Sequence, residues 1–80
     1  MSKIVSFKNN DRFIQIGIVI VTLRKLRGMS QEQLAEKAGI SRSLLSVIEA
    51  PGTARNFTLD VFFDIADALE VDPADIINVH

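Results

Sequence analysis

Cysteine is absent from the 80-residue chain, and histidine occurs once, as the final residue His80. Without cysteine, disulfide bonds and cysteine-liganded zinc are excluded, and a single histidine cannot supply the paired imidazoles of a typical metal site. No group of residues has the pattern of a catalytic nucleophile, a metal cluster or a phosphate-binding glycine loop. The sequence therefore predicts a protein that is not an enzyme and that needs no metal or cofactor.

Long apolar runs are also missing, although 48% of the residues are hydrophobic. No stretch approaches the roughly 20 residues that span a membrane. The first thirteen residues lack the apolar segment and the small-residue cleavage site of a secretory signal. We expect a soluble cytoplasmic protein with one small hydrophobic core, and domains of this size often gain stability from oligomerisation.

Basic residues do not occur in the C-terminal part of the chain. From Thr58 onward there are six acidic residues and no basic one, whereas the part before Thr58 has all nine basic residues and four acidic ones. The two parts carry −6 and +5, which sum to the net charge of −1. The first part should attract phosphate groups, and the second should face solvent or a partner. A second interpretation, that the acids only cover the solvent face of a C-terminal helix, remains equally open at this stage.

Two short helices separated by a tight turn are predicted between Ser30 and Glu49. Ser30 and Gln33 have the spacing of a capping box at a helix start. Gly39 suits the left-handed conformation in which helices end, and Ser41 can cap a second helix. The residues expected in the core are Leu34, Ala35, Ala38, Leu45 and Ile48. Short polar and basic side chains remain on the outer side of the second helix, a combination that fits the major groove of DNA.

A longer helix is expected before this pair, over residues 13–27, after capping side chains at positions 9–11. The β-branched run 18–21 favours a strand. The apolar spacing, the cations in the last turn and the Gly28 that follows favour a helix more strongly. Residues 1–10 are expected to form an N-terminal arm.

Two further helices are expected after the pair. Pro51 and Gly52 open a loop, after which Thr58 is placed to cap a fourth helix. The predicted buried stripe of that helix comprises Leu59, Phe62, Ile65, Ala66 and Leu69. Asp72-Pro73 starts a short fifth helix. Residues 11–80 are therefore predicted to form one compact all-α domain of five helices, with the helix pair at 30–49 as its centre.

The run from Ile16 to Ile77 resembles the Cro and repressor type of helix-turn-helix regulators, the XRE-like family. The residues that carry the resemblance are Leu23-Arg24, Ser30-Gln31, Leu34-Ala35, Gly39-Ile40-Ser41, Ser46, Ile48-Glu49, Leu59, Ile65-Ala66, Ala68-Leu69 and Val71. It implies a lambda-repressor-like fold and a homodimer that binds double-stranded DNA at an operator of two half-sites and regulates transcription. Within this family, the segment ARNFT at 54–58 resembles the controller proteins of restriction-modification systems.

The resemblance also implies roles for individual residues. It assigns base contacts to Arg42, Ser43, Ser46 and Val47 and phosphate contacts to Gln31 and Arg55, with Gln31 also bracing the recognition helix. Arginine can bond guanine O6 and N7 together, whereas serine discriminates bases less and valine can contact only a thymine methyl group. Arg42 could instead be a solvated surface arginine. Glu49 is expected to stabilise the fold through a hydrogen bond or an ion pair, because DNA would repel its carboxylate.

Dimer contacts are expected on the last two helices, with Phe63, Ile76, Ile77 and Val79 as candidates. The chain departs from the family pattern at Ala50-Pro51, where a basic residue and glycine are common, and at Val19 and Val21, which are often basic. These two valines lie off the apolar face of the first helix, so we expect them to contact the arm or another subunit. The valines and the acidic end favour an alternative function, an antitoxin-like interaction module that binds a toxin and binds DNA only secondarily.

Overall fold

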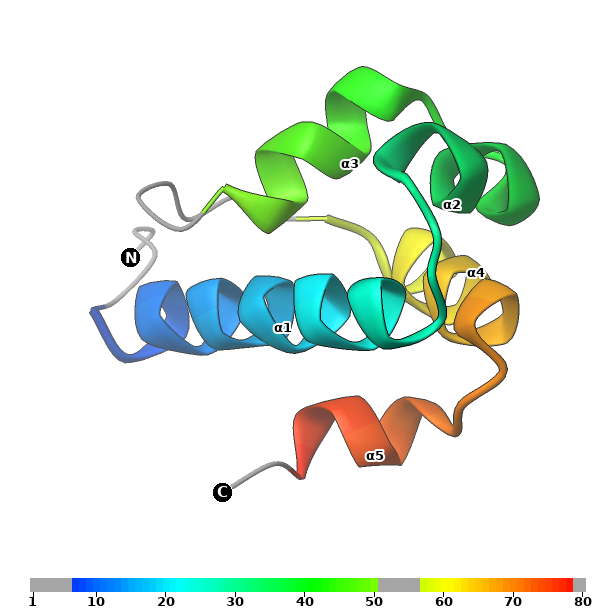
Figure 1. The fold of residues 1–80 in the computed structure, drawn as a ribbon. Coiled ribbons are helices and arrows are strands. Elements are labelled where there is room, and N and C mark those ends of the chain that lie inside the picture. The colour runs from blue at the N-terminus through cyan, green and yellow to red at the C-terminus, as the bar shows by residue number, and fades with distance from the viewer. Residues whose placement is uncertain (1–6, 51–56, 79–80) are drawn as a thin grey trace.

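Five α-helices form the part of the chain that the computed structural model describes, residues 7–50 and 57–78 (Figure 1). They are α1 (Phe7–Leu26), α2 (Gln31–Ala38), α3 (Arg42–Glu49), α4 (Leu59–Leu69) and α5 (Pro73–Ile77). The described residues contain no strand, which confirms the predicted all-α class. α1 packs against α3 on one side and α5 on the other, and α4 packs against α2 and α5. No helix in these two ranges is long and apolar enough to cross a membrane.

The start of α1 differs from the prediction. The sequence predicts a helix over 13–27, and the structure places it at Phe7–Leu26, so residues 7–10 are helical rather than part of an arm. The polar residues at 9–11 were interpreted as caps, yet they lie inside the helix. Capping preference is a weak local tendency, and a continuous helix can include such residues when the rest of it is packed.

The core is built from one side of each helix. Its fully buried large side chains are Ile20, Leu34, Leu45, Ile65, Leu69 and Ile76. All five core residues predicted for α2 and α3 are buried, which confirms that part of the pattern. Leu59 was predicted to be buried in α4, and it is 67% exposed. Helical spacing predicts the side of α4 on which Leu59 lies. It does not predict whether another helix extends far enough to cover the first turn of α4.

A second apolar cluster joins α5 to α4. Phe62, Ala66 and Ile76 form it, and Val19 of α1 packs against them. Val19 therefore already has an apolar contact within its own protomer. Ile76 is 1% exposed and belongs to this core, so its selection as a dimer contact is corrected: a side chain with no free surface cannot bury more against a second copy.

Candidate nucleic-acid interface

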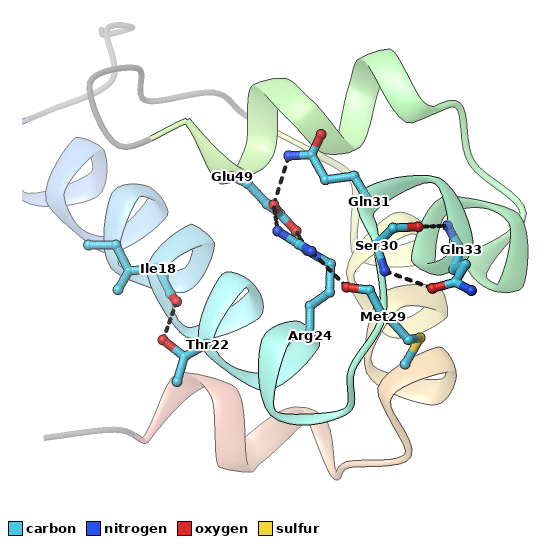
Figure 2. Close-up of polar contacts among 8 residues, drawn as sticks. All are labelled: Ile18, Thr22, Arg24, Met29, Ser30, Gln31, Gln33 and Glu49. Atoms are coloured by element: carbon cyan, nitrogen blue, oxygen red, sulfur yellow. Dashed lines mark hydrogen bonds and ion pairs between the residues drawn. The ribbon is translucent and has the colours of Figure 1, made fainter.

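α2 begins at a complete capping box. The Ser30 hydroxyl accepts a hydrogen bond of 3.0 Å from the Gln33 backbone N–H, and the Gln33 side-chain oxygen accepts one of 2.8 Å from the Ser30 N–H (Figure 2). At the other end, Gly39 adopts the left-handed φ of 74°. Both predicted devices are confirmed, and together they set the length of α2 and the turn that follows.

Helix α3 begins at Arg42, directly after its N-cap Ser41. The Ser41 hydroxyl accepts a hydrogen bond of 3.0 Å from the Leu44 backbone N–H, as predicted. Leu45 and Ile48 fix one side of the helix in the core. The opposite side therefore has a constant orientation relative to α1 and α2.

The four residues predicted to contact bases share the outer side of α3. Arg42 and Ser43 are exposed, and Ser46 and Val47 are half-buried. At about 100° per residue, these positions fall within about 140° of the helix surface. Gln31, a predicted phosphate contact, is the half-buried first residue of α2. The other predicted phosphate contact, Arg55, lies outside the described residues.

Glu49, the last residue of α3, forms a buried ion pair with Arg24 of α1. The Arg24 Nε donates to Glu49 Oε2 at 2.8 Å, and Nη2 donates to Oε1 at 3.0 Å. The two side chains are only 10% and 3% exposed. Gln31 Nε2 also donates to Glu49 Oε1, at 2.9 Å (Figure 2). The expected contacts of Glu49, an ion pair and hydrogen bonds within the fold, are confirmed.

Gly17 allows α1 to lie directly against α3. A Cβ atom added at Gly17 would overlap the backbone carbonyl oxygen of Ile48 and would lie 3.7 Å from Glu49 Cα. The contact is therefore between the backbones of α1 and α3, and only a residue without a side chain permits it.

Helices α2 and α3 have the geometry of a helix-turn-helix. Each begins at a cap, the turn between them passes through the left-handed Gly39, and α3 has a polar side that faces solvent. The profile of the helix-turn-helix family matches residues 20–76. The chain belongs to this family. It is thus a DNA-binding transcriptional regulator and not an enzyme, and the predicted family is confirmed.

Solved structures of controller proteins from restriction-modification systems share the fold of this helix-turn-helix protein. C.AhdI from Aeromonas hydrophila has a TM-score of 0.74 at 31% identity, covering 80% of this chain and 94% of that chain. Wild-type C.Esp1396I has a TM-score of 0.73 at 32% identity, covering 89% of this chain and 84% of that chain. C.Esp1396I bound to a 25 base pair operator site has a TM-score of 0.71 at 33% identity, covering 80% of this chain and 82% of that chain. A search of curated protein sequences finds no match.

The sequence interpretation missed two residues that position this helix-turn-helix. Arg24 was named as part of the family resemblance and among the cations of a last helical turn, but with no buried role, although its spacing of four from Ile20 places it on the buried side. Gly17 was not singled out, although a glycine inside a helical pattern often marks a close packing contact. Both signals are present in the sequence, but neither identifies the residue on the other helix.

Proposed function

We propose that the protein binds an operator of two half-sites as a homodimer, with each α3 in the major groove and half-site centres about 34 Å apart. The main support is the arrangement of α3, whose inner side is fixed by the core while its outer side carries exposed Arg42 and Ser43. The similar C.Esp1396I was solved bound to an operator site, which favours the same type of target here.

Specific base contacts are proposed for Arg42, Ser43, Ser46 and Val47. Arg42 has the largest discriminating role, because its guanidinium can donate two hydrogen bonds to one guanine. Gln31 and Arg55 are proposed to contact phosphates, as are backbone N–H groups at the starts of α2 and α3. One arginine, two serines and a valine give limited discrimination per protomer, so a specific site requires two protomers.

Dimerisation is proposed to involve the exposed apolar side chains of α4 and α5. Phe63 is 44% exposed and Ile77 is 59% exposed, and Val79 lies outside the described residues. Leu59 lies one turn before Phe63 on α4 and is 67% exposed, so the two side chains are neighbours on the surface of that helix. Covering such side chains on association would supply hydrophobic free energy that the isolated protomer lacks.

Operator binding is tested by selecting sites from random DNA and then measuring dissociation constants by electrophoretic mobility shift. Arg42→Ala should weaken binding to the selected site by about 1–3 kcal/mol, roughly 5- to 150-fold. The matched control is Arg12→Ala, since Arg12 is an exposed arginine on the side of α1 that faces α5. Sedimentation would verify that both variants remain dimeric. Equal affinity of Arg42→Ala and the parent would overturn the base-contact assignment.

A second candidate function is the antitoxin-like interaction module. The six acidic residues of α4, α5 and their connection are all exposed, which favours a basic partner. The packing of Val19 inside the protomer removes one of the features that favoured this alternative. Co-purification with a small basic protein, retained at low salt and released at high salt, would support it.

A further inference from the structure

The side chains of Arg24, Gln31 and Glu49 form a polar cluster that joins the end of α3 to the start of α2 (Figure 2). Both oxygens of the Glu49 carboxylate accept a hydrogen bond from Arg24, and Oε1 also accepts the bond from Gln31. Arg24 Nη1 donates to the carbonyl oxygen of Met29 at 2.8 Å, in the segment that leads into α2. One guanidinium therefore fixes both the carboxylate and the backbone from which Gln31 extends.

The carboxylate determines which way the Gln31 amide faces. A side-chain amide has an NH2 group that donates and an oxygen that accepts, whereas an ionised carboxylate can only accept. Glu49 therefore holds Nε2 toward itself, and a flipped amide would place two acceptor oxygens against each other. Among the described residues Gln31 makes only this one side-chain hydrogen bond, so its second N–H is available.

A phosphate oxygen is also only an acceptor, so it can bond the second N–H of Gln31 but not the amide oxygen. An amide that rotated freely would present the wrong atom part of the time. Because the Arg24–Glu49 pair is buried, water competes little for its hydrogen bonds, which keeps the cluster in one arrangement.

We propose that Glu49 and Arg24 are positioning residues for DNA binding, which hold the Gln31 amide so that it donates to a phosphate that neither of them touches. This inference rests on the proposed function, specifically on the Gln31–phosphate contact. It predicts that the ion pair affects operator affinity through Gln31 and through no other contact.

The test is a double-mutant cycle on the full chain. Changing Glu49 alone would leave Arg24 buried without a counter-charge. Both residues are therefore replaced in one variant, Arg24→Met with Glu49→Leu, because apolar replacement of a buried ion pair often preserves folding. This double variant and Gln31→Ala are combined, and each protein is measured for operator affinity and for its free energy of unfolding in urea. Gln15→Ala, the same change at an exposed glutamine of α1, is the matched control.

Gln31→Ala and the double variant should each weaken operator binding about tenfold, and the triple variant should be no weaker than the double. The effect of the double variant on operator affinity and that of Gln15→Ala should multiply. If the effects of the double variant and of Gln31→Ala also multiply, the ion pair acts on the fold in general and the proposal is overturned. If Gln31→Ala binds like the parent, the phosphate contact itself is wrong, and the separate result for Arg42→Ala still decides operator recognition.

A conservative variant keeps the test decisive if the double variant unfolds. Glu49→Asp retains the charge opposite Arg24 but shortens the side chain by one methylene group, which withdraws the oxygen that Gln31 bonds. It should weaken operator binding when Gln31 is present and have no effect in the Gln31→Ala background. Equal losses in both backgrounds would contradict the proposal.

Discussion

Gly17→Ala is the sharpest test of the packing that holds the recognition helix. An added methyl group overlaps the Ile48 carbonyl oxygen, which belongs to the backbone and cannot rotate away. Overpacking costs about 1–3 kcal/mol, and the upper end applies to such a rigid neighbour. Alanine gains about 1 kcal/mol of helix propensity over glycine. We therefore expect a net loss of about 2 kcal/mol in the free energy of unfolding.

Urea unfolding followed by circular dichroism measures this loss, and thermal unfolding should show a decrease in Tm of about 8–16 °C for a domain of this size. Gly28→Ala is the matched control. Gly28 has a φ of 70°, and nothing lies within 4 Å of an added Cβ, so this change costs only left-handed backbone strain, about 1 kcal/mol. A neutral or stabilising Gly17→Ala would refute the close approach of α1 to α3, because helix propensity alone would then explain the result.

Three further predictions concern single residues, and a fourth concerns the effect of salt. Leu34→Ala should lower the free energy of unfolding, measured by urea unfolding, by about 2–5 kcal/mol, because Leu34 is fully buried. Selection from random DNA should still return the same operator, and a changed operator would contradict the assignment of Leu34 to the core. Glu70 has a left-handed φ of 61°, so Glu70→Gly should raise stability by about 0.5–1 kcal/mol in thermal unfolding, and a lower Tm would count against this. Phe63→Ala should weaken dimerisation in sedimentation experiments without loss of protomer stability. Added salt should strengthen the parent dimer while it weakens operator binding, since α4 places three exposed carboxylates on each protomer. A dimer that added salt weakens or leaves unchanged would exclude α4 from the interface.

Local features of the fold could be predicted from the sequence because the interactions that determine them span only a few residues. Ser30, Ser41 and Thr58 each cap a helix through the backbone N–H three residues later, and Gly39 ends α2 where only a left-handed residue fits well. These short-range patterns were sufficient to locate α2 and α3 and therefore the family.

Features that depend on two distant segments could not be predicted in the same way. Arg24 and Glu49 are separated by 25 positions, and Gly17 meets Ile48 only after α1 and α3 have packed. The burial of Ile76 likewise depends on how α5 lies on α4, which apolar spacing within five residues does not determine.

The burial of Arg24 against Glu49 changes how many of the nine basic residues act on DNA from a distance. Two opposite charges within hydrogen-bonding distance nearly cancel outside the protein, so this arginine adds little to the attraction of phosphates. A chain with fewer effective cations releases fewer counterions on arbitrary DNA and binds it more weakly. For the operator binding proposed above, bulk genomic DNA would then sequester a smaller share of the regulator, so that fewer copies per cell would suffice to occupy a single operator.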